Sequence, residues 1–225
     1  MFIQKTLLTL RFKVLKMEDK YLNDIAEIKK MMSKSSQFIS LSGLSGILAG
    51  LYALVGAFVA KYYINEYDSY ASVLEVVNYQ NLILKLFLIA LSVLIASIVT
   101  STFFTFAKAN KQQQQRIWND TSRRLLTNFL IPIATGGIFV LLLIKNQYYG
   151  LVAPSTLIFY GLSCVNASKY TLRDVRYLGL TIVVIGLFAT YFIGYGLEFW
   201  ALGFGICHII YGSVMYFKYD RNEKK

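Results

Sequence analysis

Residues 82–107 read LILKLFLIALSVLIASIVTSTFFTFA, and this stretch decides the class of fold. It carries a single charged side chain, Lys85, and it is long enough to cross a hydrocarbon core as a helix, which takes roughly 17–25 residues. Backbone N–H and C=O groups find no water in lipid and must be satisfied within the segment, as they are in an α-helix. The stretch therefore predicts a transmembrane helix.

Five more apolar runs accompany it along the chain. The sequence has 225 residues, 56% hydrophobic and 16% charged, whereas soluble domains have about 45–50% apolar and about 25% charged residues. We predict an all-α integral membrane protein with a six-helix transmembrane bundle over 38–217. The weakest run, 150–167, carries Pro154 near its start, but a proline in the first turn of a helix removes no hydrogen bond. The six predicted spans are 38–60, 82–107, 125–144, 150–167, 177–196 and 198–217.

The net charge of +11 is distributed unevenly about these spans. Lys and Arg number eight in 1–37, five in 108–124, three in 168–176 and four in the basic tail 218–225, against three on the opposite side. An excess of Lys and Arg marks the cytoplasmic side of a membrane protein. We therefore predict a multi-pass protein of the inner (plasma) membrane with both termini in the cytoplasm. The surplus charge faces anionic lipid rather than nucleic acid.

The N-terminal segment 1–37 divides into two parts. The first sixteen residues are basic and contain no acid, so either they lie on the inner leaflet or Met17 is the true start. Residues 17–36 predict a cytoplasmic amphipathic helix. This helix either packs on its own bundle or contacts a cytoplasmic protein partner or a second copy of the chain. Its apolar stripe is Tyr21, Ile25, Ile28 and Met32.

The two longest loops carry predictions of their own. Residues 61–81 predict a short amphipathic helix on the outer membrane surface, acting as a connector or as a lid. Residues 108–124 predict a cytoplasmic extension of the second span. The residues at helical spacing in the outer loop are Tyr70, Val73, Leu74 and Val77.

Small residues recur at helical spacing in the first and last spans. Glycine and serine let two helix backbones approach closely, and van der Waals contact then drives their association in lipid. We expect these faces to pack against protein, with a pore or substrate groove as the alternative. The predicted packing residues are Ser42, Gly46 and Gly50 in the first span, and Gly205 and Gly212 in the last.

His208, the only histidine, lies between those two glycines near the middle of the last span. A polar residue inside a membrane is a candidate functional site, and Tyr211 and Asn128 are candidate polar neighbours. We expect His208 to be buried, neutral and hydrogen-bonded to a neighbouring helix; a proton relay is the alternative. No second ligand accompanies it at membrane depth, so no metal or cofactor is predicted.

Lys85 and Glu198 are the charged residues inside or at the lip of a span, near the outer boundary. Either they form an ion pair between the second and sixth spans, or each reaches water independently. Enzyme motifs such as HExxH, phosphate loops and GxSxG are absent from the sequence. The leading prediction is a non-catalytic binding or regulatory membrane protein. A small transporter or channel with a passage between the first and sixth spans is the alternative, and an intramembrane enzyme comes third.

Overall fold

The computed structural model describes residues 42–71, 79–111 and 118–221. Throughout these ranges the chain is helical, with short turns and no strand. The predicted N-terminal helix 17–36 lies outside the described residues. The elements are α2 (Gly43–Ala71), α3 (Tyr79–Lys111), α4 (Asp120–Lys145), η1 (Tyr149–Leu151), α5 (Val152–Ala167), η2 (Ser168–Tyr170), α6 (Asp174–Tyr191), α7 (Gly196–Trp200), η3 (Ala201–Ile206), α8 (Cys207–Met215) and η4 (Tyr216–Asp220).

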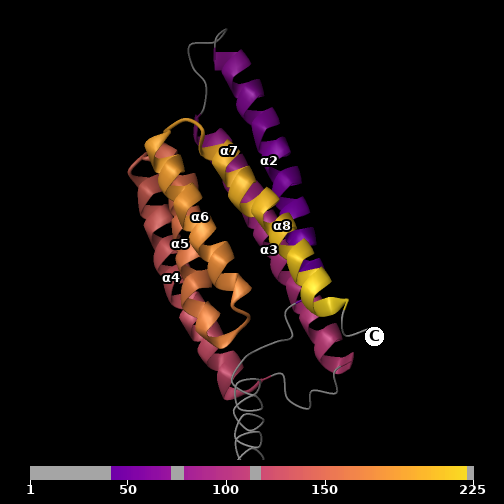
Figure 1. The fold of residues 1–225 in the computed structure, drawn as a ribbon. Coiled ribbons are helices and arrows are strands. Elements are labelled where there is room, and N and C mark those ends of the chain that lie inside the picture. Colours follow the sequence, from indigo (N-terminus) through magenta and orange to yellow (C-terminus); the bar gives the residue numbers. More distant parts are fainter. Residues whose placement is uncertain (1–41, 72–78, 112–117, 222–225) are drawn as a thin grey trace, which may run out of the picture. The chain divides into compact units, whose positions relative to one another are not determined.

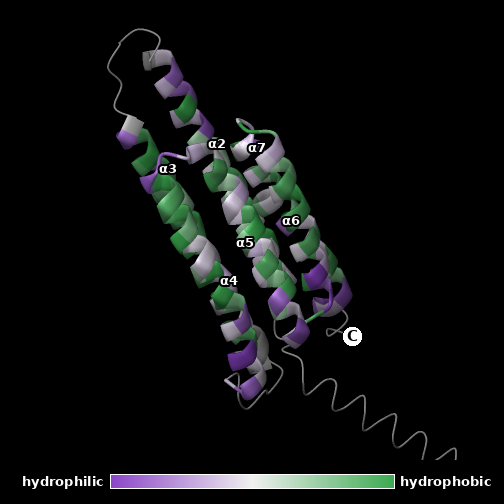
Figure 2. Ribbon diagram, turned by 90° about the vertical axis from the view of Figure 1, so that its left-hand side faces the viewer, coloured by the Kyte–Doolittle hydropathy of each residue, from purple (hydrophilic) through white to green (hydrophobic). Residues whose placement is uncertain are grey.

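Six helices are long and apolar enough to cross a membrane, which confirms the predicted all-helical class. Three of them are α2, α3 and α4; the fourth joins η1, α5 and η2, and the fifth is α6. The sixth span runs over Gly196–Asp220 and joins α7, η3, α8 and η4. Hydrophobic residues fill the middle of these helices and hydrophilic residues gather toward several of their ends (Figure 2).

The ends of the first three helices differ from the prediction. Helix α2 continues to Ala71 through the first half of the predicted outer loop, because no glycine or proline occurs between Gly56 and Ala71 to break it. Three of the four residues of the predicted surface helix, Val73, Leu74 and Val77, lie outside the described residues. Helix α4 begins at Asp120, where the Asn119 side chain accepts the Ser122 N–H at 2.8 Å and caps the first turn.

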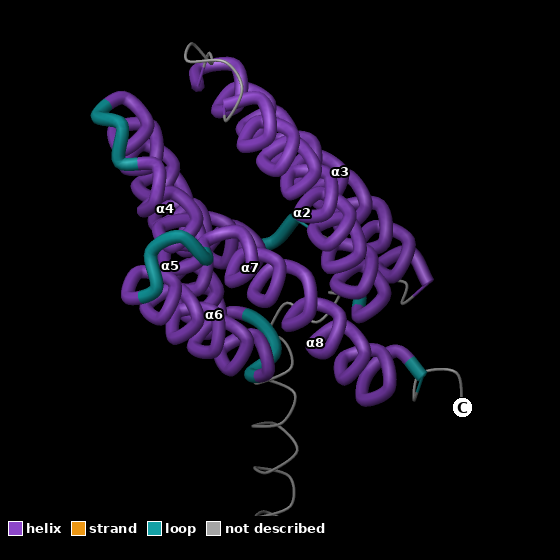
Figure 3. Tube along the Cα trace, turned by 90° about the horizontal axis from the view of Figure 1, so that it is seen from above, coloured by secondary structure: helices purple, strands orange, loops and turns teal. Residues whose placement is uncertain are grey.

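The helices pack in a defined order across the described part of the chain. Helix α3 packs on α2, α2 packs on α8 and η3 of the sixth span, and the sixth span contacts α5 and α6. Helix α6 packs on α5, and α5 packs on α4 (Figures 1 and 3). The sixth span therefore connects the α2–α3 pair with α4, α5 and α6.

Helices α3 and α4 stand at the two ends of this order. In the apolar 18-residue stretch of each helix, only 6% of the residues of α3 and 11% of those of α4 are buried, against 39% of those of α2. Their exposed side chains are mainly Leu, Ile, Val and Phe. Such an apolar surface suits the acyl chains of a bilayer.

The buried core lies where α5, α6 and the sixth span meet. Leu157 and Ile182 are fully buried there, and aromatic residues of the sixth span pack against them. Gly203 fits against α5 because a Cβ atom at that position would stand 2.5 Å from the Leu157 side chain. This core surrounds the only histidine of the chain.

Candidate intramembrane polar site

The site begins with an irregularity in the backbone of the sixth span. Over Ala201–Ile206 the helix widens to a π-helix, and the Cys207 N–H donates to Leu202 O, five residues back. In an α-helix that N–H would donate to Gly203 O, four residues back. The Gly203 carbonyl instead accepts a hydrogen bond from His208 Nδ1 at 3.0 Å. His208 therefore satisfies a carbonyl that the widened turn releases from Cys207.

The second ring nitrogen of His208 joins the sixth span to α5. His208 is 7% exposed, and its Nε2 lies 2.7 Å from the hydroxyl oxygen of Tyr160. A backbone carbonyl only accepts, so Nδ1 must carry a hydrogen. In the neutral ring Nε2 is then the acceptor, and the Tyr160 hydroxyl donates to it. A charged ring would be costly at this depth.

Aromatic rings hold this pair in place. The Phe204 ring stacks on His208 with centroids 6.0 Å apart, and the Tyr160 ring lies 5.1 Å from Phe204. Phe129 of α4 meets Tyr160 edge to face at 6.0 Å. The imidazole is thus held by two hydrogen bonds, by the Tyr160 ring of α5 and by the Phe204 ring of η3.

Tyr211, a predicted neighbour of His208, shares this core but has a different environment. Its hydroxyl oxygen is buried and has no hydrogen-bond partner among the described residues. No hydrogen bond is formed between Tyr211 and His208 in the described part of the chain.

Asn128, the other predicted neighbour, is not part of the His208 site. Its side-chain amide donates to Arg124 O, one turn back in α4, at 2.8 Å. Its own carbonyl accepts from the Asn166 side chain of α5 at 2.9 Å. That carbonyl lies four residues before Pro132, which has no N–H to donate to it. Asn166, which the sequence analysis missed, supplies the missing donor.

The glycines of the first and last spans lie against each other. A Cβ atom built on Gly46 would stand 3.1 Å from Gly212 Cα, and one built on Gly50 would stand 2.6 Å from Gly205 O. Ser42 meets the end of the last span through a hydrogen bond. Its hydroxyl donates to Asp220 Oδ2 at 3.3 Å, beside the Gly43 N–H at 2.9 Å.

Of the two alternatives for Lys85 and Glu198, the ion pair between them is not formed. Glu198 pairs with Lys61, whose Nζ lies 2.9 Å from Glu198 Oε1, and Lys85 Nζ lies 4.5 Å from the centre of the Tyr63 ring. The reason is the packing order: α2 touches the sixth span and continues helically past Lys61, whereas α3 packs on α2.

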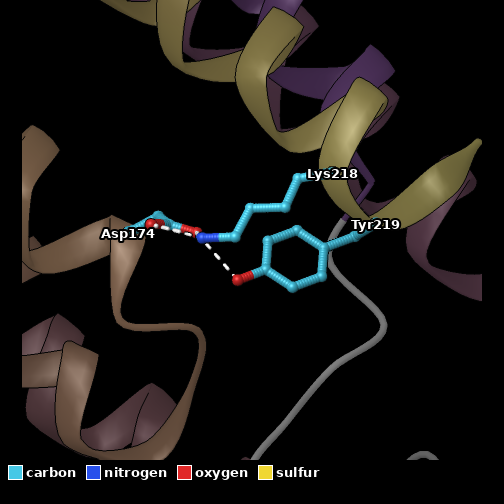
Figure 4. A network of polar contacts seen from close by, with 3 residues as sticks. All are labelled: Asp174, Lys218 and Tyr219. Atoms are coloured by element: carbon cyan, nitrogen blue, oxygen red, sulfur yellow. Dashed lines mark hydrogen bonds and ion pairs between the residues drawn. The ribbon is translucent and has the colours of Figure 1, made fainter. Parts of the chain in front are cut away.

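A second charged network ties the other end of the sixth span to α6 (Figure 4). Lys218 Nζ lies 2.9 Å from Asp174 Oδ2, and the Tyr219 hydroxyl donates to the same oxygen at 2.8 Å. Asp174 opens α6 and Lys218 lies in η4. The sixth span is therefore held to its neighbours by charged contacts at both ends.

Within the described ranges, no three His, Cys, Asp or Glu residues come together in a way that could hold a metal ion. No protein-family model, curated protein or solved structure matches the chain. The site must therefore be interpreted from its own geometry.

Proposed function

We propose that this is a non-catalytic binding or regulatory membrane protein. It lies in the inner (plasma) membrane with both termini in the cytoplasm, and residues 17–36 form its contact surface for a cytoplasmic protein or a second copy. The observation that carries the proposal is that both ring nitrogens of His208 are engaged by groups of the same chain. The one residue best suited to intramembrane chemistry is thus used to hold helices together.

The rival proposal of a passage between the first and sixth spans has less support. A passage there needs space, whereas the backbones of α2 and α8 touch at Gly46 and Gly212. His208 is also bonded to Tyr160 of α5, away from α2. Both observations favour a packed interface over a route for a substrate.

The contact surface can be tested by photo-crosslinking in living cells. A photoreactive residue at Ile25 or Ile28, on the apolar stripe, should form cross-links to a partner protein or to a second copy. Asn23 and Lys30 occupy the opposite face of the same predicted helix and are the matched controls. Cross-links confined to the chain's own transmembrane domain, or equal yields from both faces, would refute the proposed contact.

The transporter rival needs a separate measurement. The purified protein in sealed proteoliposomes should show no proton or ion flux above that of empty vesicles. A flux that is present in the parent and lost in His208→Leu would replace our proposal with the rival.

A further inference from the structure

Positive charge gathers at one end of the described helices. The first turns of α4 and α6, the end of α5 and the end of the sixth span all lie there, because successive spans run in opposite directions (Figure 1). Six cationic side chains at this end are exposed and have no acidic partner among the described residues. Arg221 follows the sixth span, and we call the other five the basic end: Arg123, Arg124, Lys169, Arg173 and Arg176.

Two of the three described acids at this end, Asp174 and Asp220, are engaged by other groups, and the third, Asp120, lies in the first turn of α4. Asp174 accepts from Lys218 and Tyr219, and Asp220 accepts from Ser42 and the Gly43 N–H. These carboxylates are therefore committed to joining helices. Asp120 can balance one positive charge, so most of the charge of the basic end is left to be balanced from outside the described chain.

The opposite end differs in this respect. Lys61 is paired with Glu198, and Lys85 lies over the Tyr63 ring. Lys145 stands in the last turn of α4, where the carbonyl end of the helix dipole favours a cation. Lys61 and Lys85 therefore each have a side-chain partner within the chain, which none of the five cations of the basic end has among the described residues.

Aromatic residues locate the basic end relative to a bilayer. Trp118, just before α4, is 65% exposed, and Tyr177, directly after Arg176, is 68% exposed. Exposed Trp and Tyr rings beside apolar helices settle at the level of lipid headgroups. The hydrophilic colours at the start of α4 in Figure 2 adjoin the hydrophobic colours of its middle. The basic end therefore stands at headgroup depth.

We propose that the basic end binds the phosphate headgroups of anionic phospholipids. The start of α4 packs against η2, which brings Arg123 and Arg124 near Lys169. Arg173 and Arg176 are three residues apart at the start of α6 and so share a face. Guanidinium groups form paired hydrogen bonds with phosphate oxygens, and clustered Lys and Arg at a membrane surface select anionic lipids.

The test uses the full-length protein reconstituted in membranes with spin-labelled lipids. The measured quantity is the association constant of labelled phosphatidylglycerol relative to labelled phosphatidylcholine. We expect this ratio to exceed one in the parent and to fall in Arg173→Gln/Arg176→Gln, by at most about fivefold for each charge removed. Lys85→Gln/Lys145→Gln removes two charges from the opposite end and should leave the ratio unchanged.

Three outcomes would overturn the proposal. The first is a parent ratio of one, and the second is an equal fall in both double variants. The third is a ratio that does not change when salt is raised to 1 M, where the Debye length shrinks to about 3 Å. Because both lipids are compared in the same sample, a partial loss of folded protein does not alter the ratio.

A final comparison tests whether the basic end binds lipid headgroups or free phosphate. Inorganic phosphate and chloride are compared at equal ionic strength, and both should lower the ratio equally if the site takes lipid headgroups. A much larger drop with phosphate would assign the basic end to a soluble phosphate ligand and overturn the lipid proposal.

Discussion

The hydrogen bond from Asn166 to the Asn128 carbonyl should be needed only because Pro132 is present. Asn166→Leu removes the donor, at 2.9 Å, from a carbonyl that proline has already deprived of its own partner. Leaving a buried acceptor unpaired costs about 1–3 kcal/mol, and interhelical side-chain hydrogen bonds in membranes average about 0.6 and reach about 1.7 kcal/mol. We therefore expect Asn166→Leu to lower the free energy of unfolding by about 1–2 kcal/mol.

Pro132→Ala should cancel most of that loss. Alanine restores an N–H four residues after Asn128, so the carbonyl regains its helical partner without Asn166. The assay is reversible unfolding in mixed micelles, applied to the parent, both single variants and the double variant. A double-mutant cycle should give a coupling of about 1 kcal/mol, well above the roughly 0.3–0.5 kcal/mol within which independent sites add.

The matched control is Asn128→Leu. This variant removes a side-chain amide from the same region, but that amide bonds only within α4, to Arg124 O, and leaves the Asn128 carbonyl in place. It should cost less than Asn166→Leu. An equal cost of Asn166→Leu with proline and with alanine at position 132 would refute the reasoning, because the bond would then not depend on the missing N–H.

Three other predictions follow from the same structure. In thermal unfolding, His208→Leu should lower the free energy of unfolding by about 1–3 kcal/mol, because the Tyr160 hydroxyl and Gly203 O lose their partner. His208→Gln keeps a donor and an acceptor and should lower it less. Equal losses in the two variants would contradict these hydrogen bonds. Gly212→Leu should destabilise by about 1–3 kcal/mol or more, and Gly137→Leu, which meets nothing within 4 Å, should not; similar melting of both would place Gly212 outside a tight interface. An impermeant thiol reagent should label a cysteine at Ser69 but not at Gln113 in intact cells, and the reverse pattern would invert the proposed topology.

The sequence was sufficient for the six spans because length and apolarity alone determine which segments can cross a membrane. It was less reliable for the ends of the helices. The first span was predicted to stop before Lys61, the first charged residue, yet a lysine at a membrane boundary does not break a helix, and α2 runs on to Ala71. The wrong partner for Glu198 is a direct consequence, since Lys61 was assigned to a loop.

The rotation of each span was the harder problem. In a membrane the faces toward lipid and toward protein are both apolar, so the pattern of polar and apolar residues does not reveal which side is buried. Asn128 was therefore grouped with His208 by depth, although its side chain bonds within α4. One signal for Asn166 was present: a carbonyl four residues before Pro132 needs a donor from a neighbouring helix.

Two irregular helices in this fold are compensated in the same way. Pro132 leaves the Asn128 carbonyl without an N–H, and Asn166 of α5 donates to it. The π-helical turn releases Gly203 O from Cys207, and His208, held in turn by Tyr160 of α5, donates to it. An unpaired backbone carbonyl is unfavourable in hydrocarbon, and in both helices a side chain donates to the affected carbonyl.

The Tyr211 hydroxyl differs from the other polar groups of this core, which hydrogen-bond to the backbone or to each other. Once the hydrogen bonds of Asn166, His208 and Tyr160 are assigned to the backbone and to each other, Tyr211 Oη is the one buried side-chain polar atom in the described ranges that the fold leaves without a hydrogen bond. His208 donates to a carbonyl of its own helix, whereas the Tyr211 hydroxyl has no hydrogen-bond partner among the described residues.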